Sequence, residues 1–258
     1  MNTQTINFHK DGSYCCLTLN REEKCHAINE QMLEELDVIL SEIEADGEIR
    51  LVEITGKGDK FFCAGGDIIS WSAYSPLDMG RKWIKRGNEV FNRLRNLPKL
   101  TIANLNGHAI GGGLELALCC DIRIARPNAK FSTPEVTLGM IPGWMGIERI
   151  LTLLPQAAAR EMLMLGKRLN AEQAQALGLV NEVVDKETGP AWIAARKEEV
   201  SKCGPVALAH IKHLINGITD KHTTYDHQLL AALMAATADC KSATEAFANK
   251  QSPTFTDN

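Results

Sequence analysis

NGHAIGGGLELALCCDIRIARPNAKFSTPEVTLGMIPG, residues 106–143, contains the pattern from which the architecture can be inferred. Its triple glycine, Gly111 to Gly113, lies between a strand-like segment and an apolar run that predicts a helix over Leu114 to Cys120. A further strand is expected at Ile122 to Ala125. Backbone N–H groups at such a glycine turn can approach a ligand closely, with a helix N-terminus behind them. This unit therefore favours a group that carries or develops negative charge.

Two glutamates of the segment could divide proton-transfer work between them. Glu115 falls in the first turn of the expected helix, where the helix dipole favours its ionised form. Glu135 precedes the apolar stretch 136–143, which we expect to be buried, and apolar surroundings or a second nearby carboxylate raise the pKa of a carboxyl group. One acid and one base could thus coexist near neutral pH, as addition of water to a polarised double bond requires. Either glutamate alone has a structural explanation.

A second glycine turn, Ala64-Gly65-Gly66-Asp67, follows another strand-and-loop element. Two such turns can supply one amide donor each to an oxyanion hole, where loss of one donor costs about 3 kcal/mol of transition-state stabilisation. A thioester carbonyl that becomes an enolate needs such a site. The glycine turns lack the sequence signatures of phosphate loops and dinucleotide-binding folds. If the glycines stood alone, they could equally serve only tight turns and close packing.

The rest of the chain predicts an α/β core followed by helices. Strand-like segments at 13–20, 49–55 and 100–106 alternate with helix-like segments at 29–45 and 79–97, which indicates parallel crossover units. From about residue 155 the pattern is helical, with one strand-like break at 179–184. We expect a core with the active site over residues 1–200 and a helical C-terminal region over 201–258.

Composition narrows the function classes. The 28 basic and 32 acidic residues give a net charge of −4, which offers no overall field for nucleic acid or an anionic membrane. No long apolar window and no leader pattern is present, so a cytoplasmic protein is expected. Most of the eight cysteines lie in apolar runs without zinc-binding spacing, as expected for reduced, buried thiols.

The histidines are weaker candidates for chemistry than the glutamates. His108 lies beside the glycine turn and could be a base, although a structural role is more common there. His26 is expected in an exposed loop or at the rim of a ligand site. His210 and His213 share a helix face but have no third ligand for a metal, so solvation explains them better.

Taken together, these residues resemble the crotonase superfamily, the enoyl-CoA hydratase and isomerase family. The resemblance covers nearly the whole chain and rests on five stretches in the expected order: LNREEKCHAIN, ITGKGDKFFCAGGDI, residues 106–143, GKRLNAEQAQALGLVNEVV and AFANKQSPTF. It implies a crotonase-like spiral of β-β-α units, with C-terminal helices that assemble homotrimers, often paired into hexamers.

The resemblance also assigns roles to residues. Gly66 and Gly112 match the oxyanion-hole amides, Glu115 matches the glutamate that activates water, and Glu135 matches the one that delivers a proton to the α carbon. The implied activity is enoyl-CoA hydratase: reversible syn addition of water to a trans-2-enoyl-CoA, giving a 3-hydroxyacyl-CoA, with no metal or redox cofactor. Contacts to coenzyme A are implied for Lys24, Cys25, Ala27, Ala64, Asp67, Ile68, Ile69 and Lys250.

Two departures from the hydratase pattern affect the substrate assignment. Trp144-Met145-Gly146 stands where hydratases usually have small residues and glycines, so we expect a bulky side chain to reshape the acyl pocket. Gln251 stands where a second basic residue is common. Another acyl-CoA lyase or isomerase on the same scaffold is the nearest alternative. A non-catalytic acyl-CoA-binding or RNA-binding homologue is a third, disfavoured by the two retained glutamates and by the negative net charge.

Overall fold

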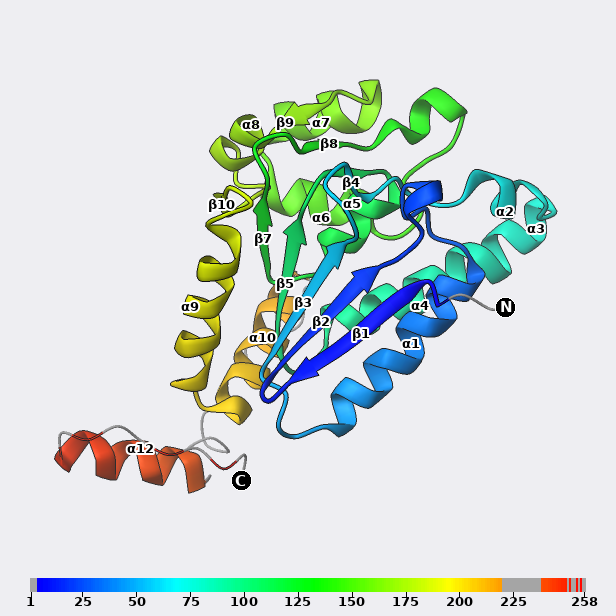
Figure 1. Ribbon diagram of the computed structural model, residues 1–258. Helices are drawn as coiled ribbons and strands as arrows, with labels where there is room; N and C mark the ends of the chain where they lie inside the picture. The colour runs from blue at the N-terminus through cyan, green and yellow to red at the C-terminus, as the bar shows by residue number, and fades with distance from the viewer. Residues whose placement is uncertain (1–3, 220–237, 250, 252–253, 255, 257–258) are drawn as a thin grey trace.

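The computed structural model describes residues 4–219, 238–249, 251, 254 and 256 (Figure 1). Its main sheet has six strands in the order β1-β2-β3-β5-β7-β10. Their bounds are β1 Ile6–Asp11, β2 Tyr14–Leu19, β3 Leu51–Gly56, β5 Leu100–Leu105, β7 Ile122–Ala125 and β10 Glu182–Val183. The first two strands form an antiparallel hairpin, and every later neighbour is parallel. The parallel crossover units expected from the sequence are thus confirmed.

A second, smaller sheet was not predicted from the sequence. It contains β4 Phe61–Cys63, β6 His108–Ile110, β8 Lys130–Ser132 and β9 Leu169–Asn170, in the order β4-β6-β8-β9. These strands are two or three residues long, too short for an alternating pattern to stand out. The long strands β3, β5 and β7 are each followed along the chain by one of them. Both glycine turns come directly after strands of this second sheet, β4 and β6.

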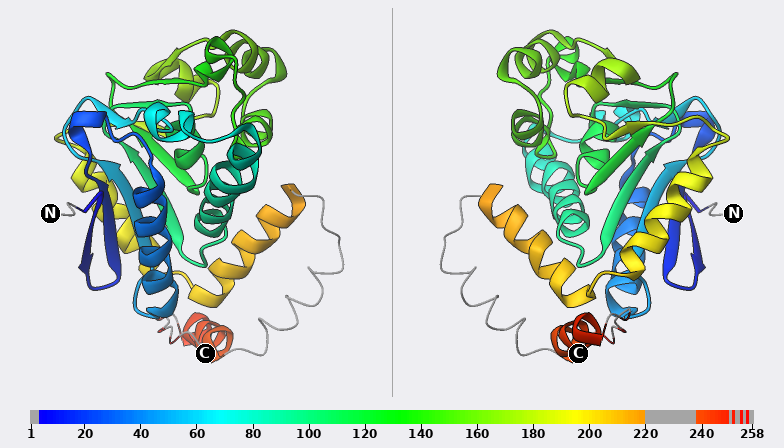
Figure 2. Two further views of the ribbon diagram at one scale, coloured as in Figure 1. Left: turned by 90° about the vertical axis from the view of Figure 1, so that its right-hand side faces the viewer. Right: turned by 90° about the vertical axis from the view of Figure 1, so that its left-hand side faces the viewer.

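The helices cover both faces of the main sheet. Their bounds are α1 Glu30–Ala45, α2 Ile68–Ser72, α3 Pro76–Asp78, α4 Lys85–Arg95, α5 Gly112–Ala117, α6 Gly146–Leu153, α7 Gln156–Leu165, α8 Ala171–Ala176, α9 Gly189–Ser201, α10 Pro205–Thr219 and α12 Ala238–Asn249, with 3-10 helices η1 Glu22–Lys24 and η3 Pro134–Leu138 and a π-helix η2 Met79–Ile84. Helices α1 and α4 pack on one face, and α9 with the start of α10 on the other (Figure 2).

Alternating side chains of the main sheet explain this arrangement. Val52 of β3 and Ala103 of β5 belong to the larger core with α1 and α4, whereas their chain neighbours Leu51 and Ile102 pack with Ile193 of α9. Because successive strand residues point to opposite faces, one continuous apolar strand can support helices on both sides. The central strands are therefore buried on both faces, which fixes the positions of the loops that follow them.

Local sequence signals set the helix starts. Asn29 accepts a hydrogen bond from Met32 N–H at 3.0 Å and caps α1, as its position before the apolar repeat predicted. The helix expected over 79–97 is real but has a π-helical first turn, η2, before α4. This wider turn places Trp83, which is buried, and Ile84 beside the cavity described below.

Candidate active site

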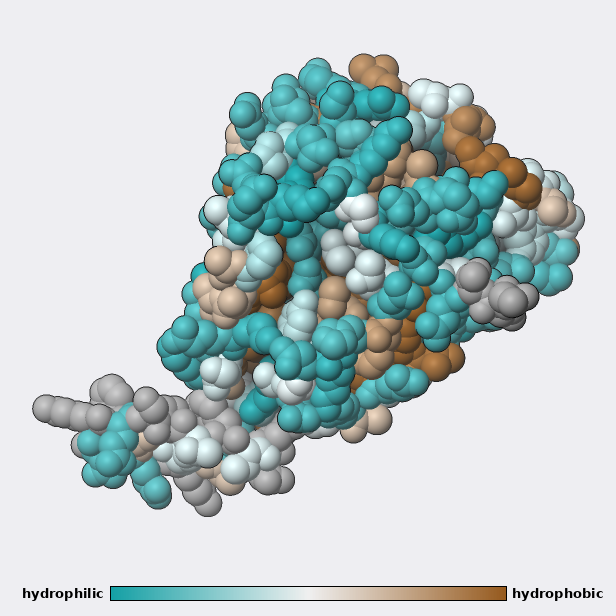
Figure 3. Space-filling model, viewed as in Figure 1, coloured by the Kyte–Doolittle hydropathy of each residue, from teal (hydrophilic) through white to brown (hydrophobic). Residues whose placement is uncertain are grey.

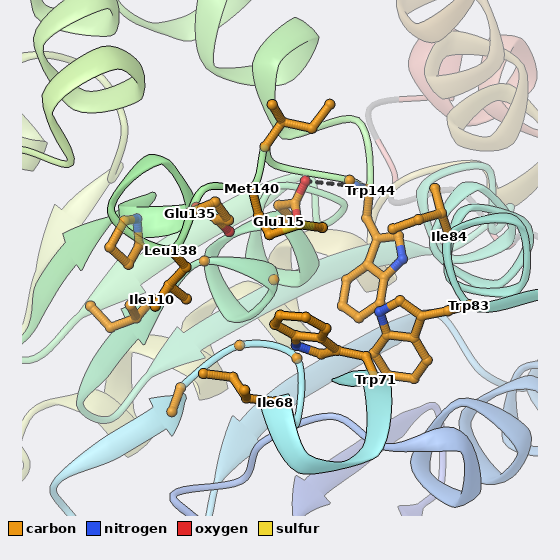
Figure 4. Close-up of a pocket in the computed structure, with 18 of the residues that line it drawn as sticks. Ile68, Trp71, Trp83, Ile84, Ile110, Glu115, Glu135, Leu138, Met140 and Trp144 are labelled. Atoms are coloured by element: carbon orange, nitrogen blue, oxygen red, sulfur yellow. Dashed lines mark hydrogen bonds between the residues drawn. The ribbon is translucent and has the colours of Figure 1, made fainter. Parts of the chain in front are cut away.

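One cavity contains both candidate glutamates and both candidate oxyanion glycines (Figure 4). Its volume is about 110 Å³. Apart from Glu115 and Glu135, its side chains are apolar or aromatic; the lining residues are Ala64, Gly65, Gly66, Ile68, Trp71, Met79, Trp83, Ile84, Ile110, Gly111, Gly112, Glu115, Pro134, Glu135, Leu138, Met140, Ile141, Gly143 and Trp144. The two glutamates and the two glycines singled out from the sequence thus lie in one cavity, and their catalytic roles stay a prediction.

Glu115 lies deep in the cavity wall, on α5. Its side chain is only 2% exposed, and Oε1 accepts hydrogen bonds from Trp144 N–H at 2.8 Å and Gly146 N–H at 2.9 Å. Burial and the nearby Glu135 carboxylate raise the pKa of Glu115 to about 7, while the two N–H donors and the charge of Arg149 oppose that shift. The expectation that the helix dipole would set this ionisation was wrong, because loss of water outweighs it.

Glu135 lies on η3, directly after Pro134. A methyl group added at Gly111 would lie 2.7 Å from Glu135 Oε1, so the glycine turn leaves the room that this carboxyl group occupies. The other oxygen, Oε2, is buried and has no hydrogen-bond partner among the described residues. Burial raises the pKa of Glu135, as expected from the sequence.

The residues after Glu135 correct a second expectation. The apolar stretch 136–143 was expected to be buried, but Leu138 is 54% and Ile141 69% exposed in this chain. Val136 is exposed as well. Figure 3 shows hydrophobic surface at the upper right of the molecule, in the area of η3. Glu135 therefore lies in the cavity beside the glycine turn, and the stretch after it lines that cavity through Leu138, Met140 and Ile141 without being buried itself.

The N–H groups of Gly66 and Gly112 lie close together at the cavity wall. A methyl group added at Gly112 would lie 3.3 Å from Gly66 N, and one added at Gly65 would lie 3.4 Å from Gly112 N. No hydrogen bond to either N–H is found within the described part of the chain. Substitution at Gly112 would also place a carbon 2.6 Å from the Trp144 ring. Two amides with free N–H groups thus face a cavity that contains two carboxyl groups.

The Gly66 turn is held by a neighbouring loop. Cys25 O accepts a hydrogen bond from Ala64 N–H, and Ile28 accepts from Asp67 N–H at 2.7 Å and donates to Gly65 O at 2.7 Å. Arg21 pairs with the Asp67 carboxylate at 2.9 Å and also donates to Ala27 O. Sequence reasoning did not identify Arg21, although its place in LNREEK next to the loop is a usable signal.

The residues expected to contact coenzyme A are only partly assembled at the cavity. Ala64 and Ile68 line it, whereas the exposed Ile69 lies on α2. The exposed Lys24 ends η1, and the partly exposed Cys25 and Ala27 lie on the loop that follows it. The Asp67 carboxylate caps α2 through Ile69 N–H and Ser70 N–H besides pairing with Arg21, so its side chain serves the turn. Lys250 lies outside the described residues.

The histidines that the structure describes do not line the cavity. His26 is buried, which corrects the expectation of an exposed loop residue: its Nδ1 accepts from Arg21 N–H and its Nε2 donates to Lys57 O. His108 packs edge to face against Phe61 and does not line the cavity. Among the described residues, no group of three or more potential metal ligands lies together, and no helix is long and apolar enough to cross a membrane.

Comparison with known proteins gives consistent matches. A family model for enoyl-CoA hydratase/isomerase matches residues 9–258. A short-chain-enoyl-CoA hydratase of Clostridium acetobutylicum is 38% identical over 84% of this chain and 82% of its own length. A crotonyl-CoA hydratase of Syntrophomonas wolfei is 39% identical over 71% of this chain and 70% of its own length. The crystal structure of an enoyl-CoA hydratase from Bacillus anthracis superposes with a TM-score of 0.91 at 30% identity, over 99% of this chain and 100% of that one.

These matches bear out the fold expected from the sequence. The chain has the crotonase-like spiral, in which long strands of the main sheet alternate with short strands of the second sheet and with helices. The helical C-terminal region is represented by α10 and α12, and its role in trimer assembly stays a prediction. So does the boundary expected near residue 200.

Proposed function

The chain belongs to the enoyl-CoA hydratase/isomerase family, and on that premise we propose that it is an enoyl-CoA hydratase. The reaction is the reversible syn addition of water to a trans-2-enoyl-CoA, which gives a 3-hydroxyacyl-CoA. The observation that carries this proposal is the meeting of two carboxyl groups and two free backbone N–H groups in one apolar cavity. The hydratase names of the relatives support a short acyl substrate.

The family resemblance assigns the two carboxyl groups different roles. Glu115 is the base that takes a proton from water while the water oxygen bonds to the β carbon; with its pKa raised to about 7 it is partly ionised at neutral pH, and its two N–H donors stabilise the ionised form. The electron pair of the double bond moves onto the thioester oxygen, which the N–H groups of Gly66 and Gly112 stabilise. Glu135, whose burial favours the protonated form, then gives its proton to the α carbon.

Substrate binding, cofactor use and assembly belong to the same proposal. Coenzyme A would lie along the loops with Lys24, Cys25 and Ala27 and the backbone of 64–69, which adjoin the cavity. The reaction needs no metal or redox cofactor, so dialysis against a chelator should leave turnover unchanged. A homotrimer or dimer of trimers and a role in fatty acid metabolism are proposed from the family resemblance, and a cytoplasmic location is proposed from the sequence pattern. Light scattering and cell fractionation test assembly and location.

The direct test is turnover of crotonyl-CoA by the purified protein. Hydration predicts loss of the enoyl-thioester absorbance and a product heavier by one water, and the Glu135→Gln variant should bind substrate but turn it over far more slowly. A product of unchanged mass would indicate isomerisation instead. Tight acyl-CoA binding without turnover over a panel of substrates would indicate a binding protein. Near-normal hydration by Glu135→Gln would contradict the proposed roles.

A further inference from the structure

The indole ring of Trp144 stands between the oxyanion glycines and helix α4. Its benzo edge faces the cavity side: a methyl group added at Gly112 would lie 2.6 Å from Trp144 Cζ3, and one at Gly66 would lie 3.7 Å from Cη2. Its pyrrole edge faces α4, where a methyl group at Gly87 would lie 2.1 Å from Trp144 Nε1. The ring therefore fills the space between the reacting carbonyl position and the core.

Neighbouring side chains hold the ring in place. Phe91 packs edge to face on Trp144 with the ring centres 5.0 Å apart. Trp83 packs on it at 5.1 Å on a tilt, and Figure 4 shows these two indoles side by side. Trp144 is 3% and Trp83 4% exposed. The Trp144 backbone is fixed as well, since its N–H donates to Glu115 and its carbonyl accepts from Arg149 at 2.7 Å. Because the ring is well packed and its backbone is hydrogen-bonded, the side of the cavity that Trp144 forms is rigid.

We propose that Trp144 is the specificity-determining residue of the acyl site, closing it behind the reacting double bond so that only short, uncharged acyl groups fit. This inference rests on the proposed hydratase function. The cavity volume of about 110 Å³ sets the scale. A closed apolar cavity of about 150 Å³ accepts benzene, so this space is of the size of a short acyl group.

The lining also selects against charged acyl groups. Among the residues that the structure describes, no cationic side chain lines the cavity to pair with a carboxylate on the acyl chain. A quaternary ammonium group binds at the open face of an aromatic ring. Trp83 packs on Trp144 and Phe91 packs on Trp144, so these two lining rings offer little open face, and Trp71 is the third indole at the cavity. Trp144 presents its benzo edge towards the glycines, and a ring edge is the positive part of the aromatic quadrupole. That edge repels a cation and suits an oxyanion.

Two substitutions should move the chain-length preference in opposite directions. Trp144→Leu keeps the backbone N–H bonded to Glu115 but removes the ring, so kcat/KM for a ten-carbon enoyl-CoA relative to crotonyl-CoA should rise about tenfold to a hundredfold. Gly87→Ala pushes on Nε1 and drives the ring towards the cavity, so kcat/KM for a six-carbon enoyl-CoA should fall more than that for crotonyl-CoA.

A matched control separates these effects from the general loss of a tryptophan. Trp192→Phe changes a ring on α9, outside the cavity, that hydrogen-bonds Glu182. Its chain-length profile should equal that of the wild-type protein. Circular dichroism and thermal melts establish that each variant folds. If Trp144→Leu does not fold, Trp144→Phe, which keeps a smaller ring, should give a weaker shift in the same direction.

The panel distinguishes failure of this inference from failure of the proposed function. If the wild-type protein hydrates no enoyl-CoA, the proposed hydratase function itself is contradicted. Active wild-type protein with the same chain-length preference in folded Trp144→Leu, or with no selective loss in Gly87→Ala, would overturn the role of Trp144. A preference of the wild-type protein for an enoyl-CoA bearing a trimethylammonium or carboxylate group over crotonyl-CoA would overturn it too.

Discussion

Helix α5 and the 3-10 helix η3 each place one glutamate in the cavity, but the two segments have opposite surroundings. Residues 111–120, which include α5, are all buried. Residues 136–139, which form the second half of η3 and its C-cap, are exposed. Glu115 is held by two backbone N–H groups, and Glu135 has an oxygen without a partner among the described residues. The difference teaches that the proposed base, Glu115, lies on a buried helix of the core. The proposed acid, Glu135, lies on a surface segment next to the glycine turn at Gly111.

Replacing each glutamate gives the largest expected effect. Glu115→Gln and Glu135→Gln should each lower kcat for crotonyl-CoA by about 10²- to 10⁴-fold, because each removes one proton-transfer group. Alanine variants then compare the two sides of the cavity, the buried wall formed by α5 and the exposed wall formed by η3. Glu115→Ala leaves Trp144 N–H and Gly146 N–H without their acceptor and should destabilise the fold by about 2 kcal/mol or more.

Glu135→Ala is the matched case on the exposed wall. It should change the free energy of unfolding by less than about 1 kcal/mol, because no hydrogen-bond donor loses a partner at Oε2. Denaturant unfolding measures both alanine variants. Equal destabilisation of the two would show that the walls do not differ as described.

Glycine substitutions on the two walls give the next largest effect. Gly112→Ala places a carbon 2.6 Å from the Trp144 ring and 3.3 Å from Gly66 N, so it should disturb both amides and lower kcat about a hundredfold. Gly139→Ala, after η3, meets no atom within 4 Å. It has a φ of +67° and should cost about 1 kcal/mol of stability with little change in kcat. A large loss of kcat in Gly139→Ala would contradict the distinction.

The pH dependence of stability should report the buried base. The pKa of Glu115 is raised from 4.5 to about 7 in the folded chain, so the folded state binds the proton more tightly than the unfolded state does. Stability therefore falls as the pH rises from about 4.5 to 7, by at most about 3 kcal/mol. The free energy of unfolding of Glu115→Gln, relative to that of the wild type, should therefore rise by that amount between pH 4.5 and 8.

Thermal or urea unfolding across this pH range measures the gain. Glu148→Gln, which changes an exposed carboxylate on α6, is the control and should show no such pH-dependent difference. A Glu115→Gln variant whose stability relative to the wild type does not change with pH would contradict the raised pKa.

The smallest expected effect lies on the exposed wall. Val136→Ser should change the unfolding free energy by less than about 0.5 kcal/mol, because this side chain already contacts water in the single chain. Leu116→Ser, on α5, should cost several times more, since Leu116 is buried. A large loss of stability in Val136→Ser would show that another copy of the chain covers this segment.

Much of this arrangement could be predicted because the decisive signals are local. Asn29 as a helix cap, the glycine turns and the two glutamates all follow from neighbouring residues, and the matched order of motifs identified the spiral fold. What failed depends on tertiary surroundings. The burial of His26 and the exposure of Leu138 are set by which elements pack over them, and short strands such as β8 leave no periodic pattern.

The ionisation of Glu115 shows the same limit in electrostatic form. From the sequence, its place in the first helical turn indicated a stabilised negative charge. In the structure, burial and the approach of Glu135 outweigh that effect and raise the pKa of Glu115. Both causes come from residues distant in the chain, and neither can be read from the helix alone.

Hydrogen exchange at the α carbon of butyryl-CoA in deuterated water tests the division of roles most directly. Butyryl-CoA has no double bond to hydrate, so exchange needs only the oxyanion hole and the group that handles the α proton. If Glu135 is that group, nuclear magnetic resonance should show exchange with the wild type and with Glu115→Gln, and none with Glu135→Gln. Exchange that is lost in Glu115→Gln but retained in Glu135→Gln would contradict the assignment.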